Sequence, residues 1–365
     1  MGLQVIYVTR HGFRSNWAVD PSTGEYSASI SSPTGIAADP ALTSYGVDQA
    51  KQLAARLRTA KPAVERVYSS PYYRCLQTIE PFVASASADP ESPLRGEGLK
   101  IRGEPGLGEW YGAAPFEHPT SAAPEVLKTL FPALDPGYVP VARPTRMGES
   151  LAELHDRVAS TMHGIISQCD TEGVKAILVC THAAVVIALG RVLTGDMPDS
   201  VEVEDFRAFT CGLSVYVRKG PKGGDATAAN DQPTTTTTTT TTGENDPTAR
   251  ISGDHEATGA KGIAPGPPAE PCIHRQASRT DPEPLAWKGR GIAGGWICTA
   301  NSDCSHLAAG EERGWRFSGD EAFANAGSAE QGVDAGLELG VVVEGRGQAV
   351  RTRRSSKTRT TSSRL

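Results

Sequence analysis

Up to about residue 218 the chain alternates short apolar runs with longer stretches in which apolar residues recur at helical spacing. A continuous apolar run bounded by polar or turn-forming residues is typical of a β-strand buried on both faces. On this basis the pattern predicts buried strands over Leu3–Thr9, Glu65–Ser69, Ala176–Cys180 and Leu213–Arg218.

Helix-start signals stand before most of the amphipathic stretches. Thr43 precedes a stripe that runs through Leu57, and Ser70-Pro71 supplies a cap followed by proline at the first helical position. Ser150 with Glu153 forms a capping box, and His182–Leu193 reads as a further, largely apolar helix. Strands that alternate with helices predict an α/β domain, with a mostly parallel central sheet between two helical layers.

The remaining chain lacks this alternation. Residues 85–147 are rich in proline and glycine, and we expect an irregular insert there, either a roof that selects substrate or a plain surface excursion. After Lys219 the sequence contains a threonine run, which is typical of a low-complexity linker. We therefore predict a globular domain over residues 1–220, a linker over 221–285, an aromatic and glycine-rich segment over 286–325 and a disordered tail over 326–365.

Charge and cysteine content bear on the cellular location of the protein and on what it could bind. The net charge is −6, and the six basic residues of 351–365, which contain no acid, leave −12 on the rest of the chain. Such a basic end predicts either a nuclear-targeting or nucleic-acid-contacting arm, or a solvated tail with no role. The seven cysteines are irregularly spaced, and no signal peptide or transmembrane stretch is evident, so we expect a soluble cytoplasmic or nuclear protein without membrane contact.

Histidines and arginines follow the predicted strands. His11 comes directly after the first strand and His182 directly after Ala176–Cys180, while Arg10, Arg14 and Arg74 belong to the same predicted rim of the sheet. Two imidazoles and three guanidiniums would repel one another without an anion, and a phosphoryl group accepts bidentate arginine bonds. The sequence therefore predicts a phosphate pocket.

A neutral imidazole is a competent nucleophile toward phosphorus, because its reference pKa of about 6.5 leaves it mostly uncharged near neutral pH. One histidine would attack while the other, with the arginines, holds the phosphoryl oxygens. The leaving alkoxide needs a proton, and Glu109 in Gly106–Trp110 is the carboxyl group that we assign to this role.

These residues lie in motifs that resemble the histidine phosphatase superfamily, also called the phosphoglycerate-mutase-like family. Arg10-His11-Gly12 is similar to its Arg-His-Gly signature. Five further segments match in order: Leu42–Gly46, Ser69–Thr78, Leu107–Trp110, Gly148–Ser150 and Cys180–Ala183.

The resemblance implies a phosphoglycerate-mutase-like three-layer α/β/α fold and no metal or cofactor. It implies His11 as nucleophile, Glu109 as proton donor, and Arg10, Arg14, Arg74 and His182 as the phosphate pocket. Asn16 falls near a position that other members use and is a candidate substrate contact. Phe13-Arg14 after the glycine is more similar to the phosphatase branches than to the mutases.

Outside these motifs, two features invite interpretation. His155 and His163 lie on an amphipathic stretch and are expected to be surface or packing residues. Three tryptophans gather in Trp287–Phe323, which suggests a segment that orders on a protein partner. A phosphatase-like domain with a long tail resembles fungal proteins related to the 55-kilodalton tau subunit of the RNA polymerase III initiation factor.

Three functions thus stay open. The leading hypothesis is a phosphomonoester hydrolase that forms a phosphohistidine on His11 and acts on a phosphorylated small molecule or a phosphoprotein. The first alternative is a transcription-complex subunit or scaffold with a vestigial phosphatase domain. A phosphoglycerate mutase is the third.

Overall fold

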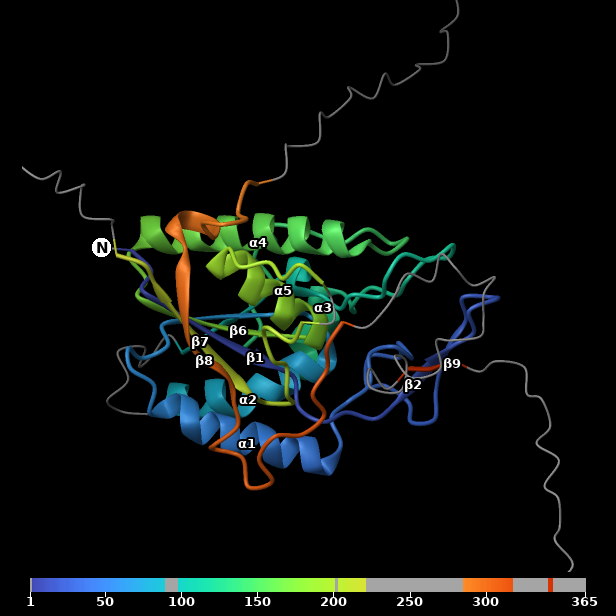
Figure 1. Cartoon of the computed structure of the whole chain (residues 1–365). Helices are drawn as coiled ribbons and strands as arrows, with labels where there is room; N and C mark the ends of the chain where they lie inside the picture. Colours follow the sequence, from blue (N-terminus) through green and yellow to red (C-terminus); the bar gives the residue numbers. More distant parts are fainter. Residues whose placement is uncertain (1, 89–97, 201–202, 221–284, 318–340, 344–365) are drawn as a thin grey trace, which may run out of the picture. The chain divides into compact units, whose positions relative to one another are not determined.

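A computed structural model describes residues 2–88, 98–200, 203–220, 285–317 and 341–343. Its main feature is a six-stranded sheet in the order β5-β4-β6-β1-β7-β8 (Figure 1). The first four strands in this order run parallel, and β7 and β8 are antiparallel to their neighbours. The strands are β1 (Val5–Arg10), β4 (Arg66–Ser69), β5 (Ile101–Gly103), β6 (Ala176–Thr181), β7 (Leu213–Arg218) and β8 (Trp296–Asp303).

Helices cover both faces of this sheet (Figure 1). One layer contains α1 (Ser44–Arg58) and α2 (Tyr73–Ala88), and the other contains α4 (Leu151–Glu172) and α5 (Ala183–Thr194). The mostly parallel α/β sandwich expected from the sequence is therefore confirmed.

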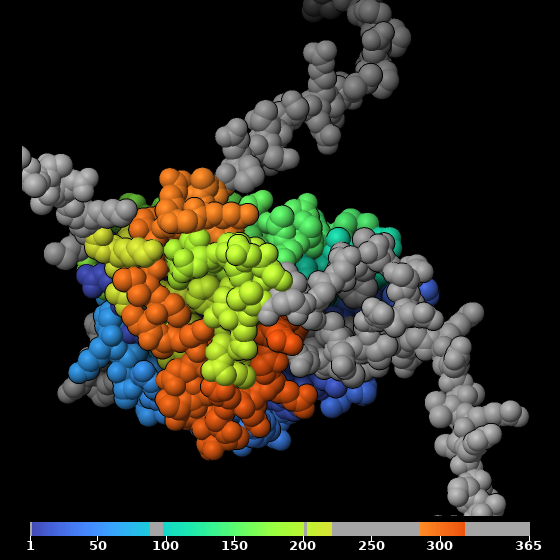
Figure 2. Space-filling view, in the orientation of Figure 1, coloured from blue at the N-terminus to red at the C-terminus, as the bar shows by residue number. Residues whose placement is uncertain are grey.

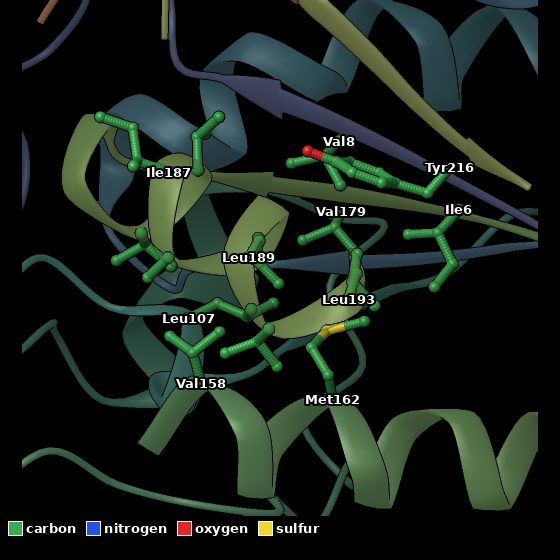
Figure 3. Packing of buried hydrophobic residues seen from close by; sticks show 14 of the residues in the cluster. Ile6, Val8, Leu107, Val158, Met162, Val179, Ile187, Leu189, Leu193 and Tyr216 are labelled. Carbon is green, nitrogen blue, oxygen red and sulfur yellow. The ribbon is translucent and has the colours of Figure 1, made fainter. Parts of the chain in front are cut away.

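The central strand β1 shows why the apolar runs are continuous. Successive side chains of a strand point to opposite faces. Val5 and Tyr7 accordingly pack into the core beneath α1 and α2. Ile6 and Val8 pack into the core beneath α4 and α5, where Figure 3 shows them facing residues of both helices.

Local signals set the helix starts. Thr43 caps α1 by accepting a hydrogen bond from the Gly46 amide, and Ser150 and Glu153 form the expected capping box of α4. Gly46 also permits a close approach, because a Cβ there would lie 2.0 Å from the Phe13 carbonyl oxygen. This packs the start of α1 onto the loop that carries His11. Helix α2 begins at Tyr73, slightly later than the Ser70-Pro71 signal indicates.

The insert contains more regular structure than its composition indicates. It includes β5, a short 3-10 helix at Pro105–Leu107 and α3 (Pro124–Leu130). A second, three-stranded sheet joins β2 (Trp17–Val19), β3 (Tyr26–Ala28) and β9 (Val341–Val343). The elements of the insert and the strands of the second sheet are too short to be recognised from hydrophobic periodicity.

The C-terminal region differs most from the sequence expectation. We expected the domain to end near residue 220, but β8 pairs with β7 as the sixth strand of the main sheet. Trp287, Trp296 and Trp315 are buried in the same core as α4 and α5. Figure 2 shows the orange surface of residues 285–317 against the yellow-green residues that precede residue 220. The tryptophans of the predicted partner-binding segment thus pack within the domain, because β7 would otherwise leave an uncovered edge.

Most of the predicted linker over 221–285, the end of the 286–325 segment and nearly all of the predicted tail over 326–365 lie outside the described residues. Within the described part of the chain, no helix is both long enough and apolar enough to cross a membrane.

Candidate active site

The two motif histidines meet at the carboxyl ends of two neighbouring strands of the sheet, β1 and β6. Strands β1 and β6 are parallel neighbours, with Arg10 in register with Thr181, so the residues that follow them emerge side by side. The ring centroids of His11 and His182 lie 5.4 Å apart, and both side chains are buried. The convergence predicted from the strand ends is therefore present in the structure.

Backbone contacts orient the His11 ring. Its Nδ1 lies 2.8 Å from the Gly12 carbonyl oxygen. Because a carbonyl oxygen only accepts, Nδ1 carries the proton and donates it, which leaves the lone pair on Nε2. The loop itself is held by the Gly12 amide, which donates to Thr78, and by the Phe13 amide, which donates to Gln49.

His182 has four polar neighbours, Glu109, Arg74, Ser70 and Cys75, of which Cys75 Sγ lies 3.6 Å from Nε2. Its Nδ1 lies 3.1 Å from Glu109 Oε2, and Arg74 Nη2 donates to the same carboxylate oxygen at 3.0 Å. Because an ionised carboxylate only accepts, the contact to Glu109 places a proton on His182 Nδ1 that points to Glu109. On the other side of the ring, Nε2 lies 2.7 Å from Ser70 Oγ. Both edges of the imidazole are thus tied to the protein.

Burial and charge shift the pKa values of the two histidines in opposite directions. Burial, together with the positive charges of Arg74 and His182, holds the pKa of His11 well below its usual value. Burial alone would lower the pKa of His182 too, but the negative charges of Cys75 and Glu109 outweigh it and raise that pKa. His11 is therefore neutral at pH 7, as a nucleophile must be.

Glu109 is ionised in this arrangement. Its burial alone would raise the pKa, but the charge and hydrogen bond of His182 and the charge of Arg74 hold the pKa of the carboxyl well below its usual range. A carboxylate in this state is ready to accept a proton. To act as the predicted donor it must first gain one.

Arg74 is held on several sides. This fully buried guanidinium contacts Glu109, donates to the Ala38 carbonyl oxygen at 3.1 Å and lies 3.5 Å from Asp39 Oδ1. Its carbon lies 4.8 Å from the centre of the Tyr72 ring. Three separate segments of the chain, at residues 38–39, 72 and 109, therefore hold the plane of the guanidinium.

Asp39 is a residue that the sequence analysis missed. Its Oδ1 accepts the Tyr73 amide proton at 2.7 Å, at the first residue of α2, and its burial raises its pKa to about 6. It stands in a serine, proline and glycine-rich loop without periodicity, so no signal marked it. Ser70 and Thr78 were included in a recognised motif, but their contacts to His182 and Gly12 were not foreseen.

Arg10 and Arg14 lie near the same centre. Their charges contribute to the low pKa of His11, and burial with the charge of Arg74 lowers the pKa of Arg14 to about 9. Arg10 Nη1 donates to the Ala208 carbonyl oxygen at 2.8 Å, and Arg14 lies over the Trp17 ring. Asn16, in contrast, is exposed and stands outside this buried cluster.

A cavity of about 360 Å³ adjoins the cluster, and its walls come mainly from the insert. Tyr72 and Glu109 belong to both the cavity wall and the site. Of the insert residues that we considered as a roof, Tyr111, Arg143 and Arg146 line the cavity, whereas Phe131 is buried in the core beside Tyr73.

The donor atoms of His11, Glu109 and His182 lie within 4.8 Å of one another, which is close enough to share a metal ion. The surrounding charge opposes that use. The pKa of His11 is lowered by the positive charges of Arg74, Arg10 and Arg14. A metal cation would add to this positive charge and be repelled by it. The arrangement suits an oxyanion better, because guanidinium and imidazole groups donate to it.

Comparisons with known proteins agree with this geometry. The sequence model of the histidine phosphatase superfamily (branch 1) matches residues 6–231. The transcription factor tau 55 kDa subunit of Saccharomyces cerevisiae is 33% identical over 226 residues, which cover 59% of this chain and 48% of that protein. The ecdysteroid-phosphate phosphatase of Drosophila melanogaster is 33% identical over 169 residues, covering 46% of this chain and 22% of that one.

Among solved structures, the ecdysone phosphate phosphatase of Bombyx mori in complex with tungstate is similar, with 22% identity and a TM-score of 0.44. The match covers 63% of this chain and 98% of that chain. The chain spans about half the length of the tau subunit and about a fifth of the Drosophila phosphatase. With the family match covering more than half of its residues, the chain belongs to the histidine phosphatase superfamily.

Proposed function

We propose that this protein hydrolyses phosphomonoesters through a phosphohistidine on His11. The observation that carries the proposal is the pairing of a neutral, oriented His11 with a positively charged surround. The Gly12 carbonyl directs the His11 lone pair to Nε2, and Arg74 and His182 lie beside it. A buried nucleophile among fixed positive charges suits the in-line transfer of a phosphoryl group.

In the first step, His11 Nε2 forms a bond to phosphorus while the bond from phosphorus to the ester oxygen breaks. Arg10, Arg14, Arg74 and His182 hold the phosphoryl oxygens. The departing oxygen takes a proton from Glu109. The ester can bring this proton, because the second pKa of a phosphate group is about 6 and part of the substrate arrives as a monoanion.

The arriving negative charge also makes proton uptake by Glu109 easier. A phosphoryl group between Arg74 and His182 would compete for the partners that now hold the pKa of this carboxyl low. After the alcohol has left, Glu109 is again a carboxylate. It then takes a proton from water as the water oxygen attacks phosphorus and the bond to His11 breaks, so that phosphate is released.

The test is metal-free hydrolysis of a panel of phosphomonoesters, including p-nitrophenyl phosphate, a phosphotyrosine peptide and 3-phosphoglycerate. We expect turnover by the wild-type protein and a loss of several orders of magnitude in H11A. His163 is exposed on α4, and H163A is the matched control, with unchanged rates. Equal rates in H11A and wild type would refute the mechanism.

The phosphoenzyme offers a second readout. Rapid acid-free quenching with a labelled substrate should trap a phosphoramidate that is labile to acid and stable to base, and H11A should not form it. Transfer of the phosphoryl group to a sugar-phosphate acceptor instead of water would favour the mutase alternative.

A second candidate function follows from the tau 55 kDa subunit, whose matched region covers 59% of this chain. We propose as the alternative that the chain is a subunit of a transcription complex, with a nuclear location and a basic C-terminus that contacts nucleic acid. Co-purification of transcription-factor subunits with tagged wild-type protein and with H11A, both with and without residues 344–365, tests this. The scaffold role would be favoured by two results together: the wild-type protein shows no phosphatase activity, and H11A co-purifies with the transcription-factor subunits as well as the wild type does.

A further inference from the structure

The described part of the C-terminal region reaches the candidate active site, although it lies beyond the residues that match the family. After β8 the chain turns back along the domain (Figure 1). There Arg10 Nη1 donates to the carbonyl oxygens of both Ala208 and Arg313. Ala208 precedes β7 and Arg313 follows β8. A guanidinium of the candidate phosphate pocket is thus held in part by a segment that the family match does not include.

The same segment contacts the loop that carries His11. The Arg313 guanidinium lies 4.5 Å from the centre of the Phe13 ring. Glu312 accepts hydrogen bonds from Tyr45 and Gln49, and Gln49 in turn accepts the Phe13 amide proton. These contacts link residues 312–313 to the start of α1 and to the chain directly after Gly12.

A third contact reaches the acid side of the site. The Phe317 ring lies 5.4 Å from that of Trp110, the residue after Glu109. Phe317 is buried, and Trp315 packs against it. Residues 311–317, which we call the C-terminal strap, therefore touch neighbours of the candidate acid as well as Arg10.

The backbone at Arg313 has the conformation that this contact needs. Its φ is 52°, in the left-handed region that is sterically unfavourable for a residue with a side chain. A cost of this kind persists where surrounding contacts hold the residue in place, and such positions cluster at functional sites. Here the left-handed turn aims the Arg313 carbonyl oxygen at Arg10.

We propose that the C-terminal strap is a positioning element of the phosphate pocket, and that the Arg313 carbonyl, with that of Ala208, orients Arg10 for the phosphoryl oxygens. With two carbonyl oxygens on Nη1, the plane of the guanidinium is set before any anion arrives. This inference rests on the proposed role of Arg10, and it adds a residue outside the family match to the site.

A pair of substitutions separates the backbone from the side chain. Proline fixes φ near −65°, so R313P cannot present the carbonyl oxygen to Arg10. Glycine adopts the left-handed conformation without cost, so R313G can keep the carbonyl in place while removing the guanidinium. The matched control is A293P. Ala293 also has a positive φ, 50°, in the same C-terminal region, and its carbonyl oxygen accepts from Arg218, remote from the candidate pocket.

The measurement is the binding of inorganic phosphate to the full-length protein by calorimetry, with folding checked by thermal unfolding. A hydrogen bond to a charged group supports a loss of about ten- to a hundredfold in phosphate affinity for R313P. We expect R313G to restore affinity to within about threefold of wild type. A293P should lower the melting temperature without lowering phosphate affinity.

Unchanged affinity in R313P would overturn the proposal, and so would equal losses in R313P and A293P. If R313P does not fold, E312A decides: it removes the contacts to Tyr45 and Gln49 without altering φ, and a several-fold weaker binding supports the proposal, whereas wild-type affinity contradicts it. Phosphate binding needs no turnover. A wild-type protein that binds phosphate but hydrolyses no ester would therefore contradict the proposed function. The comparison of phosphate affinities would still decide whether the C-terminal strap positions Arg10.

Discussion

Among the described residues, four histidines are buried, and they occupy two different surroundings. His11 and His182 lie among arginines and a carboxylate at the carboxyl ends of β1 and β6. His118 and His155 lie in aromatic stacks, on Tyr111 at 5.0 Å and on Trp287 at 5.5 Å. All four side chains are at most 3% exposed, so solvent exposure by itself does not distinguish a candidate catalytic histidine from a packing one.

The charged neighbours make the difference. Burial lowers the pKa of His118 and that of His155 to about 4, and neither ring has a carboxylate partner of the kind that raises the pKa of His182. Among the histidines that the structure describes, only those at the carboxyl ends of β1 and β6 pair an imidazole of lowered pKa with one of raised pKa. Two titratable groups whose pKa values are pushed apart by their surroundings are typical of sites that divide catalytic roles between them.

The largest expected effect separates these two surroundings directly. H11Q and H182Q should each lower kcat for p-nitrophenyl phosphate by about a thousandfold or more, since each removes a group that acts on the phosphoryl centre. H155F, which keeps a flat ring against Trp287, should retain kcat within a few-fold. Steady-state kinetics on the three purified variants checks this, and a comparable loss in H155F would break the distinction.

The next effect concerns Arg74. R74K keeps the charge but loses the planar fork that contacts Glu109 and the Ala38 carbonyl oxygen. We expect kcat/KM to fall about a hundredfold, and thermal unfolding to show a loss of about 2–4 kcal/mol, because buried partners are left unpaired. Retention of wild-type kcat/KM in R74K would show that charge alone is sufficient there.

A smaller effect appears in stability against pH. His155 has a pKa of about 4 in the folded protein and about 6.5 when unfolded, so the unfolded chain binds more protons between these values. Stability should therefore be fully present above pH 6.5 and fall as the pH decreases toward 4, by about 3 kcal/mol for this one residue. Urea unfolding of wild type and H155F across this range should give a shallower slope for the variant. Parallel slopes would contradict the low pKa.

The smallest effect is on the pH dependence of catalysis. Because the pKa of His11 is lowered, the acid limb of kcat/KM that reports its protonation should lie below pH 6.5. Removing a nearby positive charge in R14Q should move that limb to higher pH, since Arg14 contributes to the lowering. A limb that stays in place in R14Q would show that Arg14 does not contribute to the low pKa of His11.

The sequence predicted that His11 and His182 lie close together, because each follows a strongly apolar strand and the carboxyl ends of parallel strands lie on the same side of a sheet. It placed Glu109 and Arg74 near them through motif order. It did not find Asp39, whose carboxylate lies in a loop without periodic pattern. It expected His155 to be a surface or packing residue, and packing is what the structure shows, with the buried ring stacked on Trp287.

The C-terminal region shows the same limit. Trp287, Trp296 and Trp315 stood out in the sequence as aromatic residues in a soluble tail, and a partner was the natural interpretation. The structure uses them inside the domain, where β8 completes the sheet beside β7. Whether exposed residues of this region also bind a partner stays a prediction.

The sequence alone determined the alternation of strands and helices, the caps at Thr43 and Ser150, and which side chains follow the strands, because these depend on contacts between residues close along the chain. Tertiary structure decided which histidine is neutral, which carboxylate is charged, and that Arg313 lies against Arg10. Those properties depend on distance and burial between segments far apart in sequence, and residue spacing does not encode them.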